Sequence, residues 1–175
     1  DMIPEICPET RRRLDFLTVK RRYVEEADHI VAVSESTKRD LLAIYGPVST
    51  PISVVPSGVG PDFNPSAPPI PNWPREYILH VGNRANYKGG GTLLRAFAQI
   101  RRQIPGMFLI LVGGGKLSGS ELAHIHDLGI QQQVLHQHVP DALMPGAYAN
   151  ARAFVFPSEY EGFGLPVLEA MASGT

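Results

Sequence analysis

The chain has 175 residues, 43% of them hydrophobic, which is enough apolar material for a domain of ordinary size. Its formal net charge of −1 gives no electrostatic basis for binding nucleic acid, because that function usually depends on a basic surface. Cys7 is the only cysteine, so an internal disulfide is excluded and a reducing compartment is indicated.

The first 56 residues predict two helices and two short strands. Residues 8–27 form a charged helical stretch whose arginines and lysines scatter around the circumference, which favours a solvated helix over a membrane or nucleic-acid surface. Residues 29–33 and 52–55 predict strands. Between them, residues 34–43 predict a helix that Ser34 or Ser36 caps.

A proline-rich stretch separates this region from the rest of the chain. Seven prolines fall between positions 56 and 76, with little hydrophobic periodicity. Such density is typical of a semi-rigid connector rather than of a helix or strand interior. We therefore predict a first domain at residues 1–56, a linker at 57–76 and a second domain at 77–175.

The second domain shows a regular alternation of strands and helices. Strands are expected at residues 77–81, 107–112, 133–137 and 153–156, and helices at 88–104, 120–128, 141–150 (capped by Asp141) and 164–173. This pattern predicts an α/β fold with a doubly wound parallel sheet. Ligands of such sheets bind at the carboxyl ends of the strands.

Chemically suggestive residues fall at those strand ends. Arg84 and Lys88 follow the first strand, residues 113–115 (three glycines) follow the second, and Glu161 follows the last. The glycines precede Lys116 but do not make a phosphate-binding P-loop, since the required earlier glycine is replaced by Ile110. His124 and His126 cannot share a helix face, whereas His136 and His138 could share a strand face; since no cysteine lies near, a zinc site is disfavoured.

The most informative segment is Glu161-Gly-Phe-Gly-Leu-Pro-Val-Leu-Glu169, in which two carboxylates flank a glycine turn and a helix start. At about 100° per residue, Glu169 projects between Leu165 and Ala172 into a largely apolar surface, so its charge needs a partner. Glu161 precedes the helix, beside the free N–H groups of the first turn. These features suit a phosphorylated, hydroxyl-rich ligand.

The longer string Ser158-Glu-Tyr-Glu-Gly-Phe-Gly-Leu-Pro-Val-Leu-Glu-Ala-Met-Ala-Ser-Gly174 resembles the signature of retaining GT-B glycosyltransferases of the group 1 (family 4) type. Residues 1–5, 32–41, 55–59 and 81–88 also look like landmarks of that family. The Tyr87-Lys88 pair is similar to bacterial mannosyltransferase-like members. The resemblance implies an incomplete C-terminal donor domain of the Rossmann-like type, preceded by the tail of an N-terminal Rossmann-like domain.

The resemblance also implies roles for particular residues. Arg84 and Lys88 would stabilise the charge of the leaving diphosphate, and Glu161 would hold the donor sugar and stabilise the developing oxocarbenium ion. Glu169 would accept from ribose hydroxyls. The full set expected to bind the donor is Gly82, Arg84, Lys88, Gly113, Gly114, Val139, Leu143, Glu161, Gly162, Phe163, Gly164, Leu165 and Glu169, with no metal and no cofactor beyond the GDP- or UDP-sugar.

We therefore expect the parent protein to transfer a sugar, with mannose from GDP-mannose as the leading choice, to a glycan or lipid-linked acceptor with retention. The resemblance predicts a cytoplasmic enzyme and leaves open its association with the inner face of the membrane. The chain is expected to be an internal fragment that is inactive alone, rather than a complete small domain. Two other readings remain open: a catalytically inert nucleotide-binding module, and a GT-B relative such as a sugar-nucleotide epimerase or a phosphorylase.

Overall fold

The computed structural model describes residues 2–10 and 14–175, and within them the chain forms two compact α/β units. Unit 1 comprises the described residues up to Gly58 together with Glu159–Gly164. Unit 2 comprises Val59–Ser158 and Leu165–Thr175. The signature segment is thus divided between the two units, with Glu161 in unit 1 and Glu169 in unit 2.

Unit 1 contains a short parallel strand pair and its helices. Its elements are α1 (Ile3–Ile6), a 3-10 turn at Pro8–Thr10, α2 (Leu14–Glu26), β1 (Ile30–Ala32), α3 (Glu35–Tyr45) and β2 (Ile52–Val54), with β1 parallel to β2. The two strands predicted here are confirmed. The helix predicted at residues 8–27 is observed as the turn and α2, and Arg11–Arg13 lie outside the described residues.

Ser34 caps α3, because its Oγ accepts a hydrogen bond from the backbone N–H of Thr37 at 3.0 Å. Of the two candidate caps, the structure therefore selects Ser34 over Ser36. Met2, Val24 and Leu41 form the buried core beside α3, with Ile30 and Ile52 packed against it.

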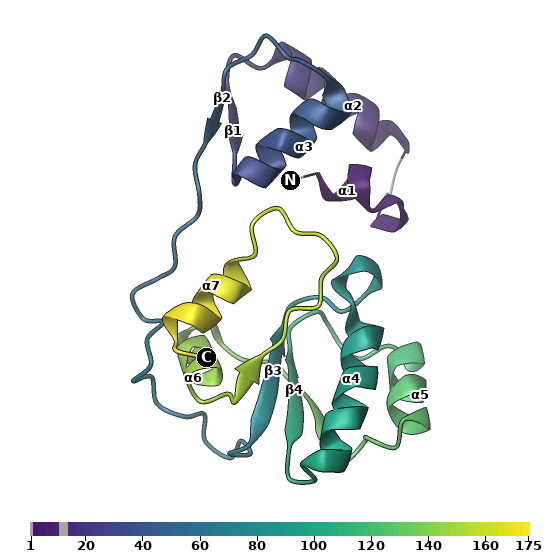
Figure 1. Ribbon diagram of the computed structural model, residues 1–175, viewed down its shortest axis with the longest axis vertical. Coiled ribbons are helices and arrows are strands. Elements are labelled where there is room, and N and C mark those ends of the chain that lie inside the picture. Colours follow the sequence, from purple (N-terminus) through teal and green to yellow (C-terminus); the bar gives the residue numbers. More distant parts are fainter. Residues whose placement is uncertain (1, 11–13) are drawn as a thin grey trace. The chain divides into compact units, whose positions relative to one another are not determined.

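Unit 2 is a four-stranded parallel sheet with helices on both faces (Figure 1). The strands are β3 (Tyr77–Val81), β4 (Phe108–Val112), β5 (Val134–Gln137) and β6 (Ala153–Phe154), in the order β5-β4-β3-β6. The helices are α4 (Gly90–Gln103), α5 (Gly119–Asp127), α6 (Met144–Ala149) and α7 (Leu165–Ala172), with 3-10 turns at Asn86–Lys88 and Asp141–Leu143.

Alternate side chains of the strands supply two separate cores. Ile78, Leu109 and Leu111 pack on one face with residues of α4 and α5. Leu79 and Ile110 pack on the opposite face with residues of α6 and α7. A strand with both faces covered is buried throughout, as the apolar runs of β3 and β4 require. The predicted doubly wound parallel sheet is confirmed.

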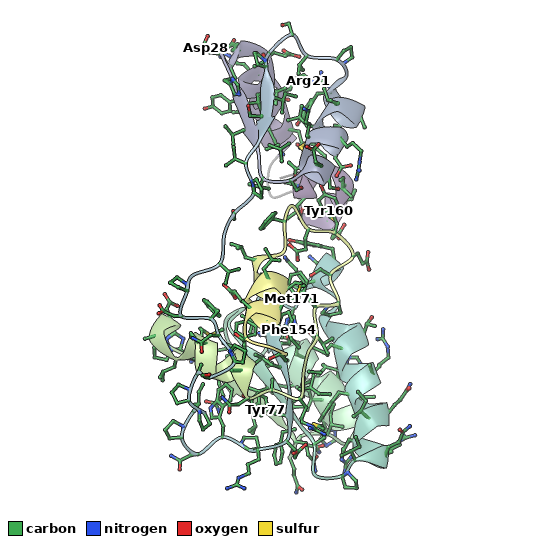
Figure 2. The ribbon with its side chains drawn as sticks, turned by 60° about the vertical axis from the view of Figure 1, so that its left-hand side comes forward. Arg21, Asp28, Tyr77, Phe154, Tyr160 and Met171 are labelled. Atoms are coloured by element: carbon green, nitrogen blue, oxygen red, sulfur yellow. The ribbon has the colours of Figure 1, made fainter. Side chains whose placement is uncertain are left out.

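Within unit 2, the proline-rich stretch after Val59 packs against the core of the sheet. Phe63, Ile70 and Trp73 lie against the core formed with α6 and α7. The ring of Trp73 contacts Tyr77 edge-on, with centroids 5.4 Å apart; Tyr77 is labelled in Figure 2. Large apolar side chains therefore anchor this segment to the sheet, and its prolines restrict the backbone between them.

Two local predictions are corrected. Asp141 does not cap a helix: it lies in the first turn of the 3-10 segment Asp141–Leu143, whose cap is Pro140, and α6 begins at Met144. The helix expected from Lys88 begins at Gly90, because Gly89 adopts a left-handed conformation with φ of 71° and ends the preceding 3-10 turn. Gly90 is buried so closely against Arg84 that no Cβ would fit.

In the part of the chain that the structure describes, none of the helices has both the length and the apolar composition to cross a bilayer.

Candidate functional site

A cavity of about 750 Å³ opens at the carboxyl ends of the central strands of unit 2. Val81 and Val112 are the last residues of β3 and β4, and Gly113 follows β4. The remaining lining residues are Asp62, Phe63, His138, Val139, Asp141, Ala142, Met144, Leu165, Pro166 and Glu169. This is the position at which doubly wound sheets bind their ligands, and the volume suits a nucleotide-sized molecule.

The chemistry of the cavity wall is mixed. Phe63, Val139 and Met144 offer apolar surface that can flank a flat ring, while Asp62, Asp141 and Glu169 offer carboxylates. Carboxylates accept hydrogen bonds strongly, so the cavity can hold a ligand that carries both an aromatic ring and hydroxyl groups.

Glu169 is fixed within this wall by Tyr148. The tyrosine hydroxyl donates a hydrogen bond of 2.7 Å to Oε2 of Glu169, and Tyr148 has 0% exposure. The prediction that Glu169 requires a partner is therefore confirmed. Burial, and then the neighbouring Glu169 carboxylate, raise the pKa of Tyr148, so the hydroxyl keeps its proton and remains a donor.

Arg84 is held by protein groups and is only 6% exposed. Its Nε donates to Oε1 of Glu121 at 2.7 Å, while Nη1 and Nη2 donate to the carbonyls of Gly113 and Gly115 at 2.6 and 3.0 Å. The guanidinium thereby fixes the glycine turn 113–115, whose three residues all have positive φ. This bracing role was not foreseen from the sequence; the phosphate contact of Arg84 stays a prediction.

Glu121 couples this arginine to the start of α5. It forms a capping box with Ser118, accepting from the backbone N–H of Ser118 at 2.8 Å while Ser118 Oγ accepts from the Glu121 N–H at 3.2 Å. Burial by itself raises the pKa of Glu121, but the hydrogen bonds from Ser118 and Arg84 outweigh it and lower that pKa. Arg84, Gly114 and Glu121 line a second, polar cavity of about 470 Å³.

Lys88 presents its ammonium group to aromatic rings. Its Nζ lies 4.9 Å from the ring centroid of Tyr87 and 5.9 Å from that of Phe156. These are distances at which a ring face attracts a cation. The lysine is half-buried at the end of the 3-10 turn that follows β3, so its charge is held close to the carboxyl end of the sheet.

His80 lies inside the sheet near the same strand ends and is 1% exposed. Its Nδ1 is 3.0 Å from the carbonyl oxygen of Val155, and its Nε2 is 3.4 Å from that of Asn83. Burial, aided by the charges of Arg84 and Lys88, lowers the pKa of His80 despite the two carbonyls, so the ring is neutral at pH 7.

The loop Glu159–Gly164 belongs to unit 1, where α3 holds it. The hydroxyl groups of Ser34 and Thr37 donate to the carbonyl of Gly162 at 2.6 and 3.1 Å. At the other end of the loop, the hydroxyl of Tyr160 (labelled in Figure 2) donates to Oδ2 of Asp40 at 2.7 Å. These three bonds surround Glu161 in the sequence and restrict its backbone.

The residues predicted to bind a donor therefore divide into groups. Gly113, Val139, Leu165 and Glu169 line the 750 Å³ cavity. Arg84 and Gly114 line the polar cavity, Leu143 lines a smaller one, and Gly82 and Lys88 lie next to β3. Glu161, Gly162, Phe163 and Gly164 belong to unit 1. Their roles toward a ligand stay predictions.

Sequence reasoning missed Asp62, Phe63 and Tyr148. Asp62 and Phe63 stand in the proline-rich stretch, where no periodicity marks a side chain as facing a cavity. The sequence indicated Tyr148 only indirectly. A carboxylate on a helix among apolar neighbours needs a hydrogen-bond donor, but here the donor is 21 positions away in the sequence and only the fold brings it close. Among the described residues, no group of three or more His, Cys, Asp or Glu side chains is placed to hold a metal ion.

Comparison with known proteins finds a family model and several relatives that match this chain. The model of the family described as glycosyl transferases group 1 matches residues 67–175. The O-antigen chain mannosyltransferase B of Escherichia coli is 30% identical over 186 residues, covering 98% of this chain and 48% of its own length. The GDP-mannose-dependent alpha-(1-6)-phosphatidylinositol monomannoside mannosyltransferase of Mycolicibacterium smegmatis is 28% identical over 173 residues, covering 90% and 45%.

A solved structure agrees with these relatives. WaaG, a glycosyltransferase involved in lipopolysaccharide biosynthesis, superimposes with a TM-score of 0.79 at 21% identity, over 97% of this chain and 49% of its own. The fold is thus of the GT-B type. The chain spans about half the length of the curated relatives it matches.

Proposed function

Since the chain belongs to the group 1 glycosyltransferase family, we propose that the protein transfers a hexosyl group from a nucleoside diphosphate sugar to a glycan or lipid-linked acceptor. The observation that carries this proposal is the cavity at the carboxyl ends of β3 and β4, with a carboxylate, Glu169, fixed in its wall by Tyr148. Apolar surface for a base and an acceptor for ribose hydroxyls are the two features that a nucleoside requires.

The proposed binding mode assigns the nucleoside to this cavity. The base lies against the apolar side chains of Phe63, Val139 and Met144, and the ribose hydroxyls donate hydrogen bonds to Glu169. The mannosyltransferases among the relatives support GDP-mannose as the leading donor, with a UDP-sugar as the alternative.

The proposed chemistry follows from the charge that develops during transfer. Departure of the diphosphate leaves negative charge on its oxygens and positive charge on the sugar ring. Lys88 and backbone N–H groups would stabilise the first, and Arg84 would contribute directly or by bracing the glycine turn. Glu161 would stabilise the sugar cation. Because these groups are fixed charges, we propose transfer that is metal-independent, and by family resemblance retaining.

The cellular setting is proposed on the same basis. We place the enzyme in the cytoplasm, where nucleotide sugars are available. If its acceptor is lipid-linked, we propose that the enzyme also associates peripherally with the inner face of the membrane. No nucleic-acid partner is proposed, in keeping with the net charge of −1.

The test is calorimetric titration with GDP-mannose and UDP-glucose in the presence of EDTA, followed by a transfer assay on any longer protein that contains this chain. We expect one donor to bind without added metal, and the transferred sugar to keep its anomeric configuration by NMR. Binding that appears only when a divalent cation is restored would overturn metal independence, and an inverted product would overturn retention.

A further inference from the structure

We infer that Tyr148 is a positioning residue for donor binding: its hydroxyl fixes the Glu169 carboxylate in the orientation that receives the ribose hydroxyls. This inference rests on the proposed function, because it concerns the same cavity. It assigns a role to a fully buried side chain that is not among the residues lining the 750 Å³ cavity.

The packing around Tyr148 makes its side chain rigid. Its ring packs edge-on against Phe63 and Phe154, with centroids 5.8 and 5.3 Å apart; Phe154 is labelled in Figure 2. The backbone carbonyl of Tyr148 also accepts a 2.6 Å hydrogen bond from the hydroxyl of Thr175. Because the ring is enclosed on these sides, the hydroxyl can point in few directions.

This rigid donor orders the side chain of Glu169. A glutamate on a helix surface samples several rotamers, and ordering it costs free energy whenever a ligand binds. The 2.7 Å bond to Oε2 selects one rotamer before the ligand arrives, and it leaves Oε1 to accept from hydroxyl groups. Since burial and Glu169 both raise the pKa of Tyr148, this bond persists over the physiological pH range.

The ordered carboxylate favours ligands that carry hydroxyl groups. Because Oε2 already accepts from Tyr148, Oε1 is the oxygen placed to accept from a ligand. A ligand that offers ribose hydroxyls gains from the preset geometry, whereas one without them faces a carboxylate that it cannot use. The Tyr148–Glu169 pair therefore distinguishes ribonucleotides from analogues that lack the 2′ and 3′ hydroxyls.

The chain provides a matched control in Tyr77. This tyrosine is 2% exposed, and its hydroxyl also donates a 2.7 Å bond, to the carbonyl oxygen of Ala147. Both Tyr148→Phe and Tyr77→Phe delete one buried hydroxyl on the same face of the sheet. Only the first removes a bond to Glu169, so a loss that both variants share reports on folding alone.

The experiment measures the affinities of GDP and UDP, each against its 2′,3′-dideoxy analogue, in the wild type and both variants, on this chain and on any longer protein that contains it. We expect Tyr148→Phe to weaken the ribonucleotide roughly tenfold and to leave the dideoxy analogue unchanged. Tyr77→Phe should change neither affinity. In a Glu169→Ala background, adding Tyr148→Phe should cost no further affinity, since the two residues act as a pair.

Equal losses for the ribonucleotide and its dideoxy analogue in Tyr148→Phe, or additive losses with Glu169→Ala, would overturn the inference while leaving the proposed function intact. A wild-type protein that binds neither GDP nor UDP would overturn the proposed function and this inference with it. Melting temperatures of all variants identify any loss that comes from unfolding.

Discussion

The two glutamates of the signature segment are eight positions apart in the sequence but are supported in different ways. Glu169 stands on α7 in unit 2, where a buried tyrosine holds its carboxylate at the wall of a cavity. Glu161 stands in a loop of unit 1, where Ser34, Thr37 and Tyr160 form hydrogen bonds that restrict the backbone on either side. The lesson is that one continuous motif depends on two separate sets of contacts.

This difference leads us to expect that mutations separate two functions. Changes in unit 2 should affect binding of the nucleotide, and changes in the loop of unit 1 should affect turnover. Three mutations test that separation, beginning with the largest effect, and a fourth tests the stability of unit 2.

The largest effect should come from Glu161→Ala in an active protein that contains this chain. Loss of the carboxylate removes stabilisation of the sugar cation, so turnover should fall by about 100-fold or more, while the affinity for the nucleoside diphosphate stays unchanged. Glu159→Ala is the control, since that glutamate is exposed in the same loop. A Glu161→Ala enzyme with wild-type turnover would remove Glu161 from the mechanism.

The next effect concerns Lys88 in unit 2. Lys88→Ala should weaken binding of GDP or UDP by about tenfold but leave guanosine or uridine unaffected, because only the diphosphate offers negative charge. Arg102→Ala serves as the control, since Arg102 is an exposed cation in the last turn of α4, at the end of the helix away from Lys88. Isothermal titration gives both affinities. Equal weakening of nucleoside and diphosphate would argue against a phosphate contact.

A smaller effect is expected for Tyr160→Phe, which removes the 2.7 Å bond to Asp40. A hydrogen bond of this kind contributes about 1 kcal/mol, so turnover should drop roughly fivefold as the loop loosens. Tyr45→Phe is matched to it, because Tyr45 donates a comparable 2.6 Å bond to Glu5 elsewhere in unit 1. If Tyr160→Phe weakened nucleotide binding instead of turnover, the proposed separation would fail.

The smallest effect concerns pH and His80. Because the folded state lowers the pKa of this buried ring, the unfolded chain binds its proton more readily. Stability should therefore be complete above the unfolded pKa of about 6.5 and should decline as the pH falls below it. His80→Gln should flatten this part of the stability curve in urea titrations, while His126→Gln, at an exposed position, should not. If stability fell with pH as steeply in His80→Gln as in the wild type, the pH dependence would have to come from another group.

Much of unit 2 could be predicted from the sequence because its signals are local. The apolar runs of β3 and β4 and the spacing of the helices were sufficient to predict a doubly wound sheet. The strand ends pointed to Gly113, and the signature segment pointed to Glu169; both residues line the cavity.

The features that the sequence did not predict depend on tertiary contacts, which hydrophobic periodicity does not encode. The position of Phe63 arises from packing of an aperiodic proline-rich segment. The engagement of Arg84 with Glu121 joins residues 37 positions apart, and the bond from Ser34 to Gly162 joins residues 128 apart. Such pairs become visible only when the chain is folded.

The most direct test of the account is thermal denaturation of the wild type and Glu169→Ala with GDP, UDP and ADP, with and without EDTA. At about 100 times its dissociation constant a ligand stabilises by roughly 2.7 kcal/mol, so one diphosphate should raise the melting temperature by about 5–10 °C. We predict that EDTA leaves this rise unchanged and that Glu169→Ala greatly reduces it. No shift with any diphosphate, or an equal shift in Glu169→Ala, would contradict a nucleotide site built on Glu169.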